Sequence, residues 1–157
     1  MKSLALKNIL FVILQPGIVA GAVPYLLVRN KLSRLLNLPF QEHQYLALLL
    51  FLAGMAIVFH CVFRFFKDGL GTLSPVIPTK QLVIGGLYQY SRNPMYIGVM
   101  LLLTGEVLFC TTVNLLIYAI LVFIAFHLFV VFKEEPRLKR DFGEQYNNYK
   151  HQVRRWI

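Results

Sequence analysis

The stretch that decides the fold is RNPMYIGVMLLLTGEVLFCTTVNLLIYAILVFIAFHLFVVFKEEP, residues 92–136. It holds two apolar runs, Pro94–Cys110 and 115–132, joined by a short turn without charged residues. Each run is close to the roughly 17–25 residues that a helix needs to cross a bilayer. Because a helical hairpin returns to the side on which it starts, the polar motifs at 92–96 and 134–136 are predicted to meet at one membrane face.

Two further apolar runs, at about residues 8–28 and 45–63, raise the predicted number of membrane-spanning helices to about four. The first run is longer than the apolar part of a signal peptide, so we interpret it as a retained span, kinked by Pro16 and Pro24. The chain is 57% hydrophobic, whereas soluble domains average about 45–50%. We therefore predict an all-α integral membrane protein, with two spans in residues 1–68 and the polar motifs in residues 69–157.

The positive charges predict the orientation. With the N-terminus in the cytoplasm, the only Lys and Arg residues on the opposite side are Arg29, Lys31 and Arg34, out of 16 in the chain. The positive-inside rule then places both termini, the loop before Arg92 and the C-terminal tail in the cytoplasm. The net charge of +9 fits attraction to anionic lipid headgroups. Nucleic-acid binding is disfavoured, because the basic residues are spread along segments that flank the membrane.

The C-terminal tail predicts an amphipathic helix on the membrane surface. Apolar residues recur there at spacings of four, four, three and four: Leu138, Phe142, Tyr146, Tyr149 and Val153. Trp156 suits an interfacial anchor. The two cysteines, Cys61 and Cys110, fall near opposite ends of their spans, so neither a disulfide nor a metal site is expected.

Each polar motif also has a purely structural interpretation. Asn93 and Pro94 suit the N-cap and first position of a helix, and Arg92 could reach toward headgroups. In the second motif, Pro136 could end one helix and start another. However, the adjacent carboxylates Glu134 and Glu135 need compensation near an anionic membrane, which a cationic ligand or Arg92 could supply. Together the motifs are more suggestive of a site than either is alone.

Other polar residues leave alternatives open. His127 precedes Glu134 by seven residues, so both are expected on nearly the same face of one helix, about 10 Å apart. Glu106 lies within the third predicted span, as either a functional group or a hydrogen-bonded tie between helices. His60 is interpreted as a packed or interfacial histidine. The Gly- and Pro-containing segment 68–88 is either a re-entrant or interfacial connection or a ligand loop.

The ordered series of motifs resembles the isoprenylcysteine carboxyl methyltransferase family, which is related to the integral-membrane phospholipid methyltransferases. The resemblance covers about residues 69–157, and it is carried by four segments and one further residue: Gly85–Tyr88 as GGLY, 91–98 as SRNPMYIG, the pair Glu134-Glu135, 142–146 as FGEQY, and Tyr149. It implies transfer of a methyl group from S-adenosylmethionine to a lipid-like acceptor.

The resemblance also implies roles for individual residues. The chemistry of the residues, beside the resemblance, makes Arg92, Tyr96 and His127 the candidates for the catalytic region, and no metal is expected. The positions that the resemblance implies for cofactor binding are Lys80, Gln81, Leu82, Val83, Tyr88, Asn93, Pro94, Met95, Tyr96 and Glu134. The adjacent carboxylate Glu135 is a further candidate for cofactor binding. Eukaryotic members usually have His at the Asn93 position, so the prenylcysteine substrate does not follow from the resemblance.

The function expected from the sequence is S-adenosylmethionine-dependent methylation of a lipophilic acceptor, a carboxylate or hydroxyl of a prenylated or other lipid-like molecule. Phospholipid N-methylation is the enzymatic alternative, and a scaffold or transporter subunit is the non-catalytic one. A transporter predicts paired polar residues at mid-membrane depth and an internal repeat, whereas here the polar residues gather at one face. If the acceptor is an amine or hydroxyl, His127 is the candidate base.

Overall fold

The computed structural model describes residues 16–37, 39–67 and 82–157, and every regular element in these ranges is a helix. Lys80, Gln81 and the first half of the first predicted span lie outside the described residues. In chain order the elements are η1 (Ile18–Ala22), α2 (Val23–Leu36), α3 (Glu42–Lys67), η2 (Gly86–Gln89), α4 (Pro94–Cys110), α5 (Val113–Phe129), η3 (Val130–Glu134) and α6 (Glu135–Gln152).

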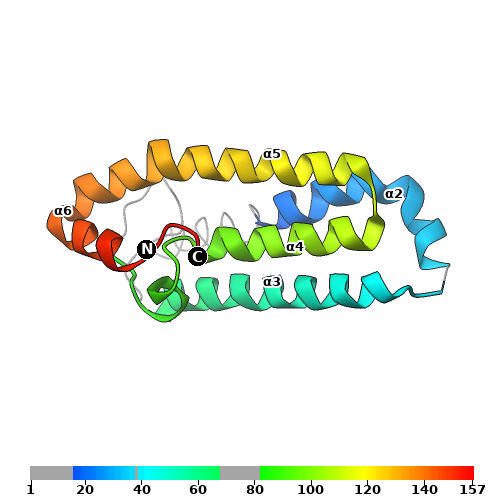
Figure 1. Ribbon diagram of the computed structural model, residues 1–157, viewed down its shortest axis with the longest axis horizontal. Helices are drawn as coiled ribbons and strands as arrows, with labels where there is room; N and C mark the ends of the chain where they lie inside the picture. The colour runs from blue at the N-terminus through cyan, green and yellow to red at the C-terminus, as the bar shows by residue number, and fades with distance from the viewer. Residues whose placement is uncertain (1–15, 38, 68–81) are drawn as a thin grey trace, which may run out of the picture.

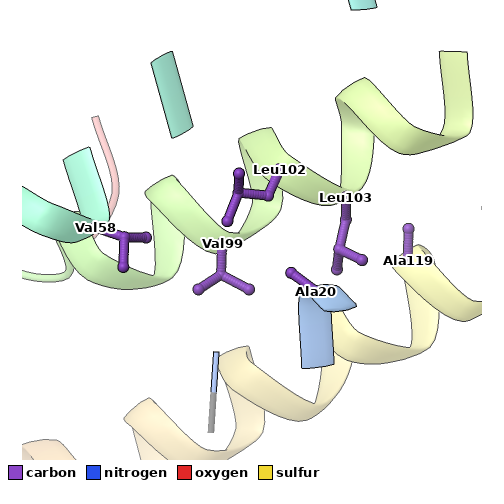
Figure 2. Close-up of a cluster of buried hydrophobic side chains, with 6 residues drawn as sticks. All are labelled: Ala20, Val58, Val99, Leu102, Leu103 and Ala119. Carbon is purple, nitrogen blue, oxygen red and sulfur yellow. The ribbon is translucent and has the colours of Figure 1, made fainter. Parts of the chain in front are cut away.

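Helices α3, α4 and α5 run side by side and antiparallel along the long axis of the molecule (Figure 1). The start of α4 and the end of α5 therefore lie at the same end of the bundle, as the hairpin predicts. A buried apolar cluster joins the helices, and Leu103 points from α4 toward Ala20 of η1 and Ala119 of α5 (Figure 2). This packing fixes where the polar motifs at the helix ends can meet.

Glycines bring α3 and α4 into backbone contact. A Cβ atom at Gly54 of α3 would lie 2.7 Å from the carbonyl oxygen of Gly98 and 2.8 Å from the amide nitrogen of Leu102, both in α4. A Cβ atom at Gly105 would lie 2.7 Å from the carbonyl oxygen of Ala47. Small residues at such crossings are how membrane helices gain close van der Waals packing, since apolar burial from water does not drive their association.

Replacing Gly54 by Ala is expected to destabilise the bundle by about 1–3 kcal/mol, because the new methyl group meets backbone atoms that cannot move aside. Gly17 is the matched control, since nothing lies within 4 Å of a Cβ atom there and its backbone is helical. Gly17→Ala should instead be neutral or stabilising by up to about 1 kcal/mol. Equilibrium unfolding in mixed micelles measures both. Equal effects of the two variants would contradict the packing argument.

The apolar helices are exposed at the surface, as expected for a membrane protein. Among the described residues, two helices are long and apolar enough to cross a bilayer: Glu42–Arg64 and Val113–Gln152. Only 22% and 17% of their apolar windows are buried, so these side chains face outward rather than into a soluble core. Pro94–Cys110 is a shorter apolar helix, and the run at 8–28 is only partly described. Two of the four predicted spans are thus supported, and the total of four stays a prediction.

Pro24 explains an irregularity at the start of the described chain. Ala20, four residues before it, has non-helical φ/ψ of −109° and 16° inside η1. A proline ring clashes with the carbonyl group four residues earlier and donates no hydrogen bond to it. The predicted kink of this segment is therefore present at Ala20.

Pro136 does not end the last long helix. The expectation of a helix end there is wrong, because the chain passes from α5 through the π-helical turn η3 into α6 without interruption. Pro136 occupies the first turn of α6, where a missing N–H group is best tolerated. A π-turn holds one more residue than an α-turn, and such turns are frequent at functional sites.

The tail folds back onto the bundle. Gly143 has φ 50° and ψ −121°, a conformation that side chains disfavour, and it bends α6. The orange and red end of α6 turns at the left of the bundle, and the chain then returns to the first turn of α4 (Figure 1). The predicted apolar face packs against the protein itself: Tyr146, Tyr149 and Val153 are buried, with Leu82 packed against them. The expectation that this face lies flat on the membrane is corrected accordingly.

Candidate functional site

The two polar motifs meet through Tyr96 and Glu134. The hydroxyl group of Tyr96, in the first turn of α4, donates a hydrogen bond of 3.0 Å to Oε2 of Glu134, at the end of η3. The ring of Phe126 in α5 packs on Tyr96 with 4.7 Å between ring centroids. The prediction that these motifs come together at one end of the hairpin is confirmed.

Glu135 joins three segments by ion pairs. Its Oε1 atom lies 3.1 Å from Nη1 of Arg92 and 2.7 Å from Nε of Arg155, and its Oε2 atom accepts a second hydrogen bond of 3.1 Å from Arg155 Nη2. Arg92 Nη1 also donates to the hydroxyl oxygen of Tyr146 at 3.1 Å. Arg92 thus compensates one of the two adjacent carboxylates, as the sequence predicts.

The two carboxyl groups have opposite electrostatic surroundings. Burial raises the pKa of Glu134 above the usual carboxyl value, although the hydrogen bond from Tyr96 and the charge of Arg137 oppose that shift. Burial acts on Glu135 in the same direction, but the hydrogen bond from Arg155 and the charge of Arg92 outweigh it and lower its pKa. Both oxygen atoms of Glu135 are therefore bound by arginines, and its role is structural. Glu134 is buried too, but its negative charge is less fully compensated by neighbouring positive charges.

Asn93 and its neighbours bind the C-terminal tail by hydrogen bonds. Asn93 precedes α4 as its N-cap residue and Pro94 follows, as predicted, but the Asn93 side chain makes no capping hydrogen bond. Its Nδ2 atom instead donates to the carbonyl oxygen of Arg155 at 2.9 Å, and the Arg92 amide donates to that of Arg154 at 3.0 Å. Ser91 supports this junction, because its Oγ accepts from the Asn93 amide. The side-chain role of Asn93 is therefore to fasten the tail.

The described part of the 68–88 segment packs between α3 and α6. Tyr88 is buried, its phenol shares a hydrogen bond with the Cys61 thiol, and its carbonyl oxygen accepts one of 2.6 Å from the hydroxyl group of Tyr149. Burial raises the pKa of Tyr88 well above its usual value, so this phenol stays protonated. Leu82 contacts the apolar face of α6 and Val83 is half-buried, while Gly85 lies against the guanidinium group of Arg64.

His127 belongs to a neighbouring aromatic group. Trp156 stacks on it with 6.2 Å between ring centroids and an interplanar angle of 27°, and Phe123 lies 5.7 Å from the Trp156 ring. The extra residue of the π-turn between His127 and Glu134 means that seven residues no longer make two whole turns. Phe126, rather than His127, is therefore the residue that packs beside Tyr96 and Glu134.

Four residues of this end were not proposed as site residues from the sequence: Arg155, Tyr146, Tyr149 and Trp156. Their contacts depend on the bend at Gly143, although the resemblance includes the FGEQY segment and Tyr149, which was a signal for them. Arg92 Nε and Trp156 Nε1 are among the buried donor atoms at this end, and neither has a hydrogen-bond partner among the described residues. No group of three or more potential metal ligands occurs within the described ranges.

Comparison with known proteins gives one match. A family model described as phospholipid methyltransferase matches residues 43–145, which is more than half of the chain. The match begins in α3 and ends in α6, so it contains Tyr96, Glu134 and Glu135 but not Arg155 or Trp156. No curated protein and no solved structure matches the chain.

Proposed function

Since this chain belongs to the phospholipid methyltransferase family, we propose that it binds S-adenosylmethionine at the Tyr96–Glu134 junction and methylates a lipophilic acceptor there. The observation that carries the proposal is a buried carboxyl group, Glu134, held by Tyr96 where the two halves of an apolar hairpin meet. S-adenosylmethionine carries a positive charge on sulfur and, when bound, would supply an electrophilic methyl group. A buried carboxylate is a suitable partner for such a cation.

The residues around Glu134 fit the other parts of this cofactor. Arg92 Nε and Trp156 Nε1 are buried donors without partners among the described residues, and each could bind an acceptor atom of the ligand. The rings of Tyr96 and Phe126 provide an aromatic surface. Glu135 is occupied by Arg92 and Arg155, so we assign it to positioning rather than to direct cofactor contact.

Methyl transfer is a displacement at carbon that depends mainly on holding the reacting groups in line. We propose that the acceptor enters from the bilayer with its polar end at this junction, while Arg92 and Tyr96 orient the groups there. An acceptor carboxylate needs no base. An acceptor amine or hydroxyl needs one, and His127 would take its proton. The charge distribution supports a cytoplasmic location for this end.

The class of reaction can be tested by equilibrium binding of tritiated S-adenosylmethionine to detergent-purified protein. Saturable binding, competed by S-adenosylhomocysteine, is expected. Incubation with total membrane lipids should then move the label into the organic phase. Alkali releases methanol from a methyl ester but leaves an N-methyl group or a methyl ether in place, so alkali-labile label identifies a carboxyl acceptor. The mass of the stable product then separates an N-methylated phospholipid from a methyl ether. No binding at millimolar cofactor would contradict the proposal and favour the scaffold or transporter alternative.

Cofactor affinity is expected to fall on acidification at a higher pH than an ordinary carboxyl group would give. The reason is that the pKa of Glu134 is raised, so this group loses its negative charge as the pH falls through that higher value. Binding isotherms measured at steps of about half a pH unit between pH 5 and 8 would give a Kd at each pH and so the midpoint of the loss of affinity. Glu134→Gln should remove this step, and an unchanged pH profile in that variant would show that Glu134 is not the titrating group.

With an amine or hydroxyl acceptor, the variant His127→Ala is expected to lower methyl transfer about 100-fold, with S-adenosylmethionine affinity within about twofold of wild type. This split follows if His127 accepts a proton from the acceptor and does not hold the cofactor. Tritium transfer to lipid and equilibrium binding give the two numbers on one preparation. Phe123→Ala is the control, since it removes another ring beside Trp156 without removing a base. Wild-type turnover in His127→Ala would exclude the base role.

A further inference from the structure

A cavity lies at the opposite end of the bundle from the candidate site. It has a volume of about 290 Å³ and is lined almost entirely by apolar groups of η1, α2, α3, α4 and α5, including Gly21, Val28, Phe51, Phe109 and Leu115. Tyr96 and the one carboxyl group of this cavity, Glu106, are ten residues apart on α4. At 1.5 Å per residue this separation is about 15 Å along the helix. The cavity is therefore distinct from the Tyr96–Glu134 junction.

Glu106 gives this cavity a specific chemistry. Its Oε2 atom is buried and has no hydrogen-bond partner among the described residues, and none of the ion pairs between described side chains involves Glu106. A carboxylate without compensation in an apolar environment is costly. A ligand that brings both positive charge and N–H donors would remove this cost, and an ammonium group brings both.

The size and the opening of the cavity indicate what carries that ammonium group. Tyr25 and Leu48 line the cavity and are 58% and 47% exposed, so the cavity opens sideways between α2 and α3 at the apolar surface. A ligand would reach it from the bilayer. Its volume is at the small end of the roughly 300–1,000 Å³ of small-molecule pockets. One alkyl chain fits such a space better than a two-chain lipid does.

We propose that this cavity binds a single-chain amphiphile with a terminal ammonium group, a long-chain amine. Its chain lies against the apolar residues of α2 and α3, and the ammonium group donates hydrogen bonds to Glu106 Oε2. The proposal does not depend on methyl transfer, because no residue of the Tyr96–Glu134 junction takes part.

Photolabelling tests the proposal with a dodecylamine that carries a diazirine in its chain. The full chain is placed in phosphatidylcholine nanodiscs, irradiated, and digested for peptide mass spectrometry. Label is expected on peptides of α2 and α3 that line the cavity. Unlabelled dodecylamine should compete, while dodecanol and dodecanoate should compete at least 10-fold less well. Glu106→Gln, which keeps the shape and removes the charge, should reduce labelling about 10-fold or more.

A second pair of variants tests the space itself. Gly21 lines the cavity and Gly17 does not, and nothing lies within 4 Å of a Cβ atom at either position. Gly21→Leu should reduce labelling, and Gly17→Leu should leave it unchanged. Equal labelling of wild type and Glu106→Gln, or equal competition by dodecanol, would overturn the ammonium assignment. If phosphatidylethanolamine competes and dodecylamine does not, the assignment of a single-chain ligand is overturned. If Glu106→Gln does not fold, the glycine pair and the competitors still decide.

Discussion

Glu134→Gln is expected to weaken S-adenosylmethionine binding by about 10- to 150-fold, the largest effect on cofactor affinity of any single change at this end. Hydrogen bonds and ion pairs to a charged group contribute about 1.5–3 kcal/mol, and each 1.4 kcal/mol is a factor of ten. The substitution keeps the size of the side chain and an acceptor for the Tyr96 hydroxyl group. What it removes is the negative charge proposed to face the cofactor. Equilibrium binding of tritiated cofactor measures the change.

Two controls separate this role from a general effect of charge. Glu144 is an exposed carboxylate on α6, and Glu144→Gln should bind the cofactor as wild type does. Tyr96→Phe leaves the Glu134 carboxyl group in place without its donor and should cost less than Glu134→Gln. Wild-type affinity in Glu134→Gln would remove this residue from the proposed cofactor site, even if methyl transfer itself were observed.

Glu135→Gln is expected to reduce the free energy of unfolding by about 3–5 kcal/mol, the range for breaking one side of a buried ion pair. Only 8% of the Arg92 side chain and 12% of the Glu135 side chain are exposed, so the substitution leaves the Arg92 charge uncompensated and mostly out of water. It also replaces one of the two oxygens that accept from Arg155 by an NH2 group, which cannot accept, and it removes the charge from the bond that remains. Equilibrium unfolding in mixed micelles would record the loss.

The pair Arg140–Asp141 on the same helix is the comparison for Glu135. Its Arg140 side chain is 77% exposed, and exposed pairs contribute about 0–1 kcal/mol, so Asp141→Asn should change stability little. Because the pKa of Glu135 is lowered, its contribution to stability is present above the ordinary carboxyl pKa and disappears as the pH falls through the lower folded value. Equal losses in Glu135→Gln and Asp141→Asn would contradict the burial argument.

The hairpin and the meeting of its motifs were predictable from the sequence. The hydropathy of the sequence gives the bounds of α4, Pro94–Cys110. In an antiparallel hairpin the start of the first helix and the end of the second lie at the same end, so Tyr96 and Glu134 must meet there. The compensation of Glu135 by Arg92 follows from the cost of leaving adjacent carboxylates unpaired. These predictions depend on membrane length and charge, which a single sequence carries directly.

The contribution of the tail was not predictable in the same way. The spacing from Leu138 to Val153 predicts an apolar face but does not say whether lipid or protein covers it. The answer depends on one residue, Gly143, whose positive φ turns the chain back. Arg155 then binds Asn93 through a main-chain oxygen, and side-chain type carries no signal for such a contact. The π-turn η3 was not predictable from the sequence either, because Pro136 is compatible both with a helix end and with an uninterrupted helix.

The bond from Asn93 to Arg155 joins residues that are 62 positions apart, and this has a consequence for how the protein is made. The apolar helices α3, α4 and α5 all precede residue 155 along the chain, so each of them is synthesised before the residues that close the polar end. The polar end, in contrast, stays open until α6 has bent at Gly143 and the following residues have reached the start of α4. The order of synthesis therefore separates the apolar bundle from its polar end, and completion of that end depends on the residues that follow Gly143.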